Sequence, residues 1–255
     1  MKAALRDRAP GLVAVLAFIV GWEAYCRLSG VSALLLPAPS AVAVALVELI
    51  GERATWRHFA ITLGETLAGF TLAAVFGLGL GAAVARSRLL ERAVQPFVVA
   101  SQVVPKVALV PLFVLWFGFG PTSKIVVSAV IAFFPVLTNT LLGMRSVEAG
   151  HRDVFRAARA GSLQRFWLLE LPAALPAVLA GMEMAIVLAT IGAVVGEFLG
   201  GSAGLGYLAV ATMNAFQTDR LFGIILMLAL MGLVLHAAIG ALRRVMIPWH
   251  EAAIY

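Results

Sequence analysis

Long apolar stretches alternate with short polar segments along nearly the whole chain. A helix that crosses a bilayer needs about 20 mostly apolar residues, and six stretches reach that length. They cover residues 11–29, 59–85, 94–117, 123–144, 174–199 and 221–247. No segment shows the alternating pattern of a transmembrane strand. The sequence therefore predicts an all-α polytopic membrane protein with six transmembrane helices in one domain, residues 1–255.

Prolines and polar residues refine this picture. Pro105 and Pro111 fall inside the third stretch, and because proline removes a helical hydrogen bond, we expect that helix to be kinked or broken. Before the second stretch, residues 36–40 (Leu-Pro-Ala-Pro-Ser) predict a turn, and Ser40 is placed to cap a short amphipathic helix over about 41–51 at the outer interface. The first stretch is longer than the core of a signal peptide, so we interpret it as a membrane anchor.

Composition agrees with lipid as the solvent of this chain. Hydrophobic residues make up 62% of it and charged residues 13%, whereas a soluble domain carries about a quarter charged residues. Cys26 is the only cysteine, which excludes an intramolecular disulfide and a cysteine-based metal cluster. The histidines are scattered without ligand spacing, so we predict no metal site.

The basic residues concentrate in every second loop. They precede the first stretch, follow the second, separate the fourth from the fifth and follow the last: Lys2, Arg6, Arg8, Arg86, Arg88, Arg92, Arg145, Arg152, Arg156, Arg159, Arg165, Arg243 and Arg244. The other loops hold Arg53, Arg57, Lys124 and Arg220. Because cytoplasmic loops are rich in Lys and Arg, we expect both termini to lie in the cytoplasm. The net charge of +6 then reflects topology, and nucleic-acid binding is disfavoured.

One polar segment, residues 153–172, lies between the fourth and fifth stretches. We predict a helix over about 153–164 that lies across the membrane face, where a short rigid helix would transmit force between two proteins. Asp153 near its start suits the positive end of the helix dipole, and Phe155 offers an apolar anchor of the kind that dominates interfaces. Pro172 is expected to end the helix. The alternative is a basic loop that only fixes the topology.

This segment resembles the cytoplasmic coupling motif of bacterial ABC importer permeases, which is written EAA…G…LP. Aligned without gaps, Asp153 takes the place of the motif's glutamate, Phe155 of its second alanine and Arg159 of its glycine. A frame shifted by two residues recovers Ala157 and Gly161 but loses the acid and needs a gap, so we prefer the gapless frame. The resemblance implies a role in coupling to an ATPase for Asp153, Val154, Phe155, Arg156, Ala157, Ala158, Arg159, Gly161 and Pro172.

Other blocks strengthen the resemblance. They are residues 104–120 in the third stretch, Gly196-Glu197-Phe198 with the following 204–208, the turn at 36–40, and the tail Pro248-Trp249-His250. Together they resemble the nitrate, taurine, alkanesulfonate and bicarbonate group of importer permeases. That group also contains transporters for thiamine-precursor pyrimidines and riboflavin. The resemblance implies import of a small anionic solute, with a pyrimidine precursor or riboflavin as the alternative.

The resemblance also implies a fold, a location and a set of partners. The fold is that of a type I ABC importer permease in the bacterial inner membrane, paired with a second copy or with a non-identical permease. Two ATP-binding cassette subunits hold ATP and Mg²⁺ inside, and a periplasmic or lipid-anchored binding protein delivers the solute outside. The chain has no Gly-x-x-x-x-Gly-Lys-[Ser/Thr] phosphate loop. We therefore predict that it is not an enzyme and holds no cofactor.

Four polar residues at membrane depth are candidates for lining a translocation path, because such residues usually face a cavity or a partner. Lys106 would attract a passing anion, pair with an acid or reach an interface. Glu183 and Glu197 lie fourteen residues apart on one helical face, where they line the path or, as we prefer, pair with basic or hydroxyl groups. Asn139 donates into the bundle centre or, as we prefer, bonds a neighbouring helix.

Two other classes of protein compete with the importer interpretation. Residues 200–204 fit Gly-x-Ser-x-Gly and His236 follows, as in a rhomboid-type intramembrane serine protease. However, the predicted depths of Ser202 and His236 differ by about ten residues of helix, or roughly 15 Å. A passive channel subunit fits the apolar pattern, but it has no need of the coupling segment.

Overall fold

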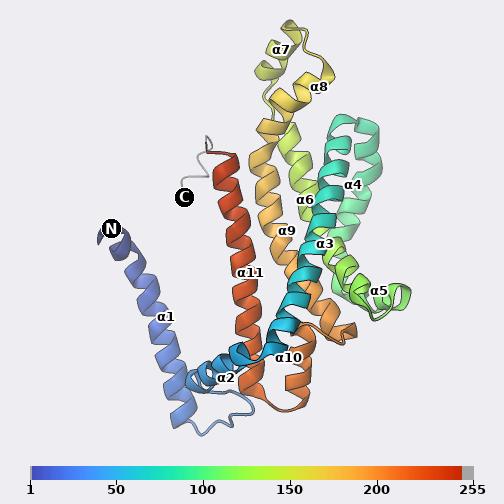
Figure 1. The fold of residues 1–255 in the computed structure, drawn as a ribbon. Helices are drawn as coiled ribbons and strands as arrows, with labels where there is room; N and C mark the ends of the chain where they lie inside the picture. Colours follow the sequence, from blue (N-terminus) through green and yellow to red (C-terminus); the bar gives the residue numbers. More distant parts are fainter. Residues whose placement is uncertain (1, 249–255) are drawn as a thin grey trace.

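The computed structural model describes residues 2–248, which form helices joined by short turns, with no strand in that range. Trp249 and His250 of the tail lie outside the described residues. The elements, shown in Figure 1, are α1 (Lys2–Leu28), α2 (Pro39–Gly51), α3 (Arg53–Arg86), α4 (Arg88–Val103), η1 (Lys106–Leu109), α5 (Val110–Phe117), α6 (Pro121–Arg145), α7 (Ala149–Ala157), α8 (Ser162–Arg165), η2 (Phe166–Glu170), α9 (Leu171–Gly200), α10 (Leu205–Asn214) and α11 (Thr218–Met246).

Five helices within the described range are long and apolar enough to cross a membrane: α1 from Pro10 onward, α3, α6, the continuous segment Ser162–Gly200, and α11. The remaining predicted span, the third (residues 94–117), is broken. Its two halves, α4 and η1–α5, meet at an angle of 92°. The break falls at Val104 and Pro105, where the sequence predicted it, because Pro105 has no N–H to continue the helical ladder.

Pro172 does not end a helix, contrary to the prediction. The chain stays helical from Ser162 to Gly200, and a π turn, η2, immediately precedes the proline. In this turn the Leu171 N–H donates to the Phe166 carbonyl, five residues back. A π turn is a known way to absorb a local irregularity within a helix, so the fifth span begins on the loop side of residue 174.

The centre of the bundle is built from α3, α6 and α9. Small residues bring the backbones together: a Cβ added to Gly77 on α3 would lie 2.8 Å from the Val136 Cβ, and one added to Gly81 would lie 2.7 Å from the Thr140 Cβ. The apolar core at this crossing consists of Phe70, Ala73, Ala132, Val136, Ala185, Ile186 and Ala189. Close approach through glycine and alanine is typical of helix packing in membranes.

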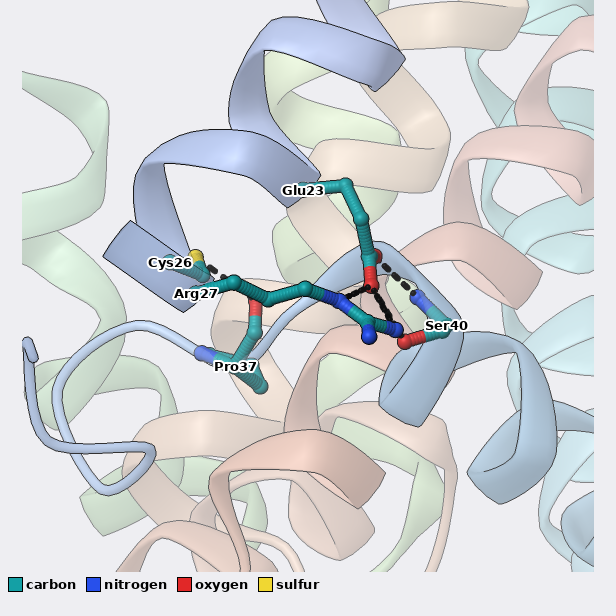
Figure 2. A network of polar contacts seen from close by, with 5 residues as sticks. All are labelled: Glu23, Cys26, Arg27, Pro37 and Ser40. Atoms are coloured by element: carbon teal, nitrogen blue, oxygen red, sulfur yellow. Dashed lines mark hydrogen bonds and ion pairs between the residues drawn. The ribbon is translucent and has the colours of Figure 1, made fainter. Parts of the chain in front are cut away.

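The α2 helix lies at the end of the bundle opposite α7, and α1 stands apart from the other long helices (Figure 1). Ser40 does not cap α2 as predicted, because the helix begins one residue earlier at Pro39. Instead, the Ser40 hydroxyl and N–H donate to the Glu23 carboxylate at 2.8 and 3.0 Å, while Arg27 approaches the same carboxylate (Figure 2). These contacts fasten the end of α1 to the start of α2.

Candidate functional site

The predicted coupling segment projects beyond the ends of α6 and α9 at one end of the bundle (Figure 1). Its helix, α7, spans Ala149–Ala157 and not the predicted 153–164. Asp153 is therefore the fifth residue of the helix, whereas the dipole favours an acid only within the first turn. The helix dipole therefore does not explain the acid at Asp153, contrary to the prediction. Its carboxylate instead accepts a hydrogen bond from Arg156 at 3.0 Å, with both side chains exposed.

The end of α7 explains why the helix is shorter than predicted. The Arg159 N–H donates to the Arg156 carbonyl at 2.9 Å, and the Ala160 N–H donates to the Phe155 carbonyl at 3.0 Å. These two bonds form a Schellman motif, which requires a left-handed residue after the cap. Arg159 supplies it with φ of 51°. The helix therefore cannot continue toward residue 164.

The same geometry bears on the alignment of the motif. The gapless frame assigns the glycine of EAA…G…LP to Arg159, and Arg159 has the backbone conformation that favours glycine. Gly161, which the shifted frame would use, has φ of −66° and ψ of 163°, a conformation open to any residue. The backbone thus agrees with the gapless frame, although the coupling role of these residues stays a prediction.

Apolar side chains are exposed among the charged residues of α7 and α8. Val154 is 64% exposed, Leu163 is 70% exposed and Trp167 is 58% exposed. Phe155 is half-buried, and Ala157 and Ala158 are exposed with little side-chain bulk. Exposed apolar side chains beside small residues are what a docking surface for another protein needs.

Two of the four candidate path residues, Lys106 and Asn139, make contacts within the bundle. Lys106 contacts an aromatic ring, and Asn139 packs between two helices. Lys106 lies at the break of the third span, with its Nζ 5.3 Å from the centroid of the Phe134 ring, a cation–π distance. The Asn139 amide does not bond a neighbouring helix as we preferred, because it donates to the Pro135 carbonyl one turn back in its own helix, α6, at 2.9 Å. Its Cβ also packs where a Cβ on Gly181 of α9 would lie, 2.6 Å away. Asn139 therefore contributes to the contact between α6 and α9.

The two glutamates of α9 both have partners, as the preferred interpretation expected. Glu183 pairs with Arg243 of α11 at 3.0 Å. Glu197 is 1% exposed and accepts from the Thr62 hydroxyl at 2.7 Å and the Gly206 N–H at 2.6 Å. The fourteen-residue spacing places them about 21 Å apart along α9, so they belong to different contacts.

The Glu197 contacts are part of a buried polar cluster that the sequence did not reveal. The Thr62 hydroxyl also accepts from the Leu205 N–H at 2.7 Å, and His58 accepts from the Gly204 N–H at 3.0 Å. These bonds tie the first turn of α10 to α3 and α9. Gly204 itself requires glycine, because its φ is 105° and an added Cβ would overlap the Glu197 carboxylate.

Among the charged residues, Lys124 differs most from its predicted position. The sequence placed it in a loop, but it is 3% exposed in the first turn of α6. Its ammonium donates to the carbonyls of Gly120 at 2.9 Å and Gly200 at 2.7 Å, and also to Phe119. A cation at the carbonyl end of α9 is favourable because that end carries partial negative charge.

The protease interpretation fails on position. His236 approaches the Glu183 carbonyl at 3.5 Å, whereas Ser202 follows the Glu197 end of α9. The two ends of that segment of α9 are about 21 Å apart, so Ser202 and His236 do not form a nucleophile–base pair.

Comparison with known proteins gives consistent matches along the chain. A family model described as "Binding-protein-dependent transport system inner membrane component" matches residues 59–249. The formylaminopyrimidine transport permease protein ThiX of Halalkalibacterium halodurans is 36% identical, over 98% of this chain and 99% of that protein. The riboflavin transport system permease protein RibX of Chloroflexus aurantiacus is 40% identical, over 94% and 90%.

A third relative and a solved structure are also similar to this chain. The putative aliphatic sulfonates transport permease protein SsuC of Bacillus subtilis is 34% identical, over 95% of this chain and 88% of that protein. An inward-facing structure of the MetNI methionine ABC transporter matches with a TM-score of 0.68 and 19% identity, over 76% of this chain and 96% of the matched one. The latter similarity shows the fold alone.

Proposed function

Because this chain belongs to the family of binding-protein-dependent transport system inner membrane components, we propose that two permease subunits, this chain and a second copy, enclose the path of a small solute. The chain is the permease component of an ABC importer, with the all-helical fold of type I permeases. The observation that carries the proposal is α7, a short helix with an exposed apolar surface held beyond the bundle between α6 and α9.

The side on which α7 lies follows from charge. We assign the end of the bundle that holds α7 and α8 to the cytoplasm, because its loops contain most of the arginines. Both termini then face the cytoplasm, and α2 and α10 lie at the outer face. The ATPase partners, with their ATP and Mg²⁺, dock on α7, and the binding protein docks outside near residues 200–219.

The mechanism that we propose is alternating access. Closure of the ATPase dimer moves α7, whose residues Asp153, Phe155 and Ala157 contact the partner. The segment from Ser162 to Gly200, which stays helical through the π turn η2, carries this motion across the membrane. The broken third span and α9 then rearrange between the two permease halves.

We propose a small anion, of the nitrate, sulfonate or taurine type, as the solute. The support is Lys106, a cation at the broken part of the third span that contacts an aromatic ring. The alternative is a pyrimidine precursor or riboflavin: relatives named for those solutes are 36% and 40% identical, beside a relative named for aliphatic sulfonates that is 34% identical. Lys106, Asn139, Glu183 and Glu197 remain proposed path residues.

Purification of the tagged protein from membranes of its own host, with mass spectrometry of the co-purifying proteins, tests this proposal. We expect an ATP-binding cassette ATPase and a solute-binding protein. The binding protein is then screened by thermal shift against taurine, alkanesulfonates, nitrate, pyrimidine precursors and riboflavin. Recovery of the chain alone, under gentle conditions and with crosslinking, would contradict the importer proposal and favour a passive channel.

A further inference from the structure

A basic cavity lies at the root of the coupling segment, where α7, α8 and η2 meet the ends of α3 and α6. Its volume is about 350 Å³. The residues that line it are Ala85, Arg86, Met144, Arg152, Arg156, Ser162, Arg165 and Glu170. Four guanidinium groups and one carboxylate therefore surround one space. The coupling mechanism described above has no use for this concentration of positive charge.

Two of the four arginines are held in fixed positions. Glu170 accepts from Arg86 at 3.2 Å and from Arg165 at 3.2 Å, and its own side chain is only 15% exposed. The Arg86 guanidinium also lies over the Phe166 ring, 4.2 Å from its centroid. A carboxylate and an aromatic ring thus orient these arginines before any ligand arrives, which lowers the entropy lost on binding.

The carboxylates around the other two arginines do not balance the positive charge of the cavity. Arg156 is paired with Asp153, at 3.0 Å on the exposed side of α7. Arg152, one turn earlier on the same helix, is half-buried at the cavity wall. Even with Asp153 included, four arginines face two carboxylates, Glu170 and Asp153. The cavity therefore has an excess of two positive charges.

The chemistry of the lining selects one class of ligand. Guanidinium groups present planar pairs of N–H donors that match the oxygens of phosphate, and the Ser162 hydroxyl adds a further donor at the wall. We propose that this cavity binds a phosphate group, which braces α7 and α8 against the ends of α3 and α6. A phosphate dianion would neutralise the excess charge. The phosphate can belong to an anionic lipid headgroup or to a soluble phosphate compound.

The test uses the purified full-length permease without its partners, in phosphatidylcholine nanodiscs with and without phosphatidylglycerol. Retained lipid is measured by native mass spectrometry, and binding of inorganic phosphate is measured by thermal-shift titration. Arg152→Gln removes one guanidinium and spares the Glu170 contacts. Arg92→Gln is the matched control, since Arg92 is exposed on α4 at the same end of the bundle and does not line the cavity.

We expect Arg152→Gln to weaken phosphate binding about tenfold, the usual effect of losing one charge-assisted hydrogen bond, and Arg92→Gln to leave it unchanged. Selective loss of retained phosphatidylglycerol identifies the lipid as the source, and selective loss of the inorganic phosphate shift identifies a soluble compound. Equal effects of the two variants would show non-specific attraction and overturn the proposal. The absence of both kinds of binding would overturn it as well.

Discussion

At Arg159 the backbone has a conformation that arginine adopts only under strain. A left-handed residue other than glycine costs about 1 kcal/mol or more, and Arg159, with φ of 51°, is one of two such residues in the described range. We expect Arg159→Gly to stabilise the end of α7 by about 1 kcal/mol. Hydrogen exchange would then slow severalfold at the Ala160 amide, which closes the Schellman motif.

Gly161→Ala is the control for this prediction. Gly161 has an extended backbone and an added Cβ would meet only the Gln164 side-chain oxygen at 3.8 Å, so we expect no change in hydrogen exchange at the Ala160 amide. Faster exchange at Ala160 in the Arg159→Gly variant would show that the arginine side chain, and not the backbone, sets the stability of this turn.

Glu197 is the residue on which the buried polar cluster depends. In Glu197→Ala, the buried Gly206 N–H loses its acceptor, and the Thr62 hydroxyl keeps only its longer bond to the His58 carbonyl at 3.2 Å. Leaving buried donors unpaired costs about 1–3 kcal/mol each, so we expect the thermal unfolding midpoint in detergent to fall by several degrees. Glu48→Ala, an exposed glutamate at the same end of the bundle, should leave the midpoint unchanged; an equal drop would assign the effect to net charge.

At the scale of helices, the contact between α3 and α6 is set by two glycines one turn apart. Gly77→Ala places a methyl group 2.8 Å from the Val136 Cβ, which forces the helices apart. Overpacking of this kind costs about 1–3 kcal/mol. We expect the free energy of unfolding, measured by denaturant titration, to fall by the same amount.

Gly79→Ala provides the opposite result on the same helix. An added Cβ at Gly79 meets nothing within 4 Å, and alanine is the better helix former by about 1 kcal/mol. We expect this variant to be as stable as the natural protein or more so. If both variants lost stability equally, helix flexibility and not close packing would be the reason for glycine in α3.

The length of the apolar stretches located the spans, and proline located the break in the third, because both signals are local. Helix ends were predicted less well. Ser40 was interpreted as the cap of a helix over 41–51 and Asp153 as a first-turn residue, whereas α2 begins at Pro39 and α7 at Ala149. The type of a residue does not by itself show whether it precedes a helix or lies inside it. The π turn before Pro172 likewise has no local signal.

The candidate site was predicted in part. The coupling segment was found because its polarity and its motif are contiguous, and the backbone at Arg159 agrees with the gapless alignment. The partners of Lys124 and Glu197 could not be identified from the sequence because they lie far away along the chain. Lys124 reaches Gly200 across 76 positions. Only the packing of α6 against α9 brings these groups together.

At the scale of the whole molecule, the proposed importer predicts that α7 controls transport without supporting the fold. Ala157 is exposed and belongs to none of the described core clusters. Ala157→Trp should therefore insert and unfold like the natural protein, but it should lose uptake by blocking close docking of the ATPase. Uptake into vesicles and ATPase co-purification measure the two effects.

The matched control carries the same substitution at the opposite end of the bundle. Ala41→Trp alters an exposed alanine of α2, which is far from α7 (Figure 1), and should leave association with the ATPase intact. Normal uptake by Ala157→Trp would show that the ATPase docks elsewhere. A second bulky replacement, Asp153→Trp, is expected to behave as Ala157→Trp does.

The Thr62–Glu197 hydrogen bond also has a consequence for how the protein is made. The two residues are 135 positions apart, and a bacterial ribosome adds about 5–20 residues per second. Thr62 and the neighbouring Glu65 therefore leave the ribosome about 7–27 s before Glu197 does. During that interval an acidic side chain, costly in lipid, has no finished bundle around it. Completion of the outer half of α3 in the membrane thus has to wait for the synthesis of α9.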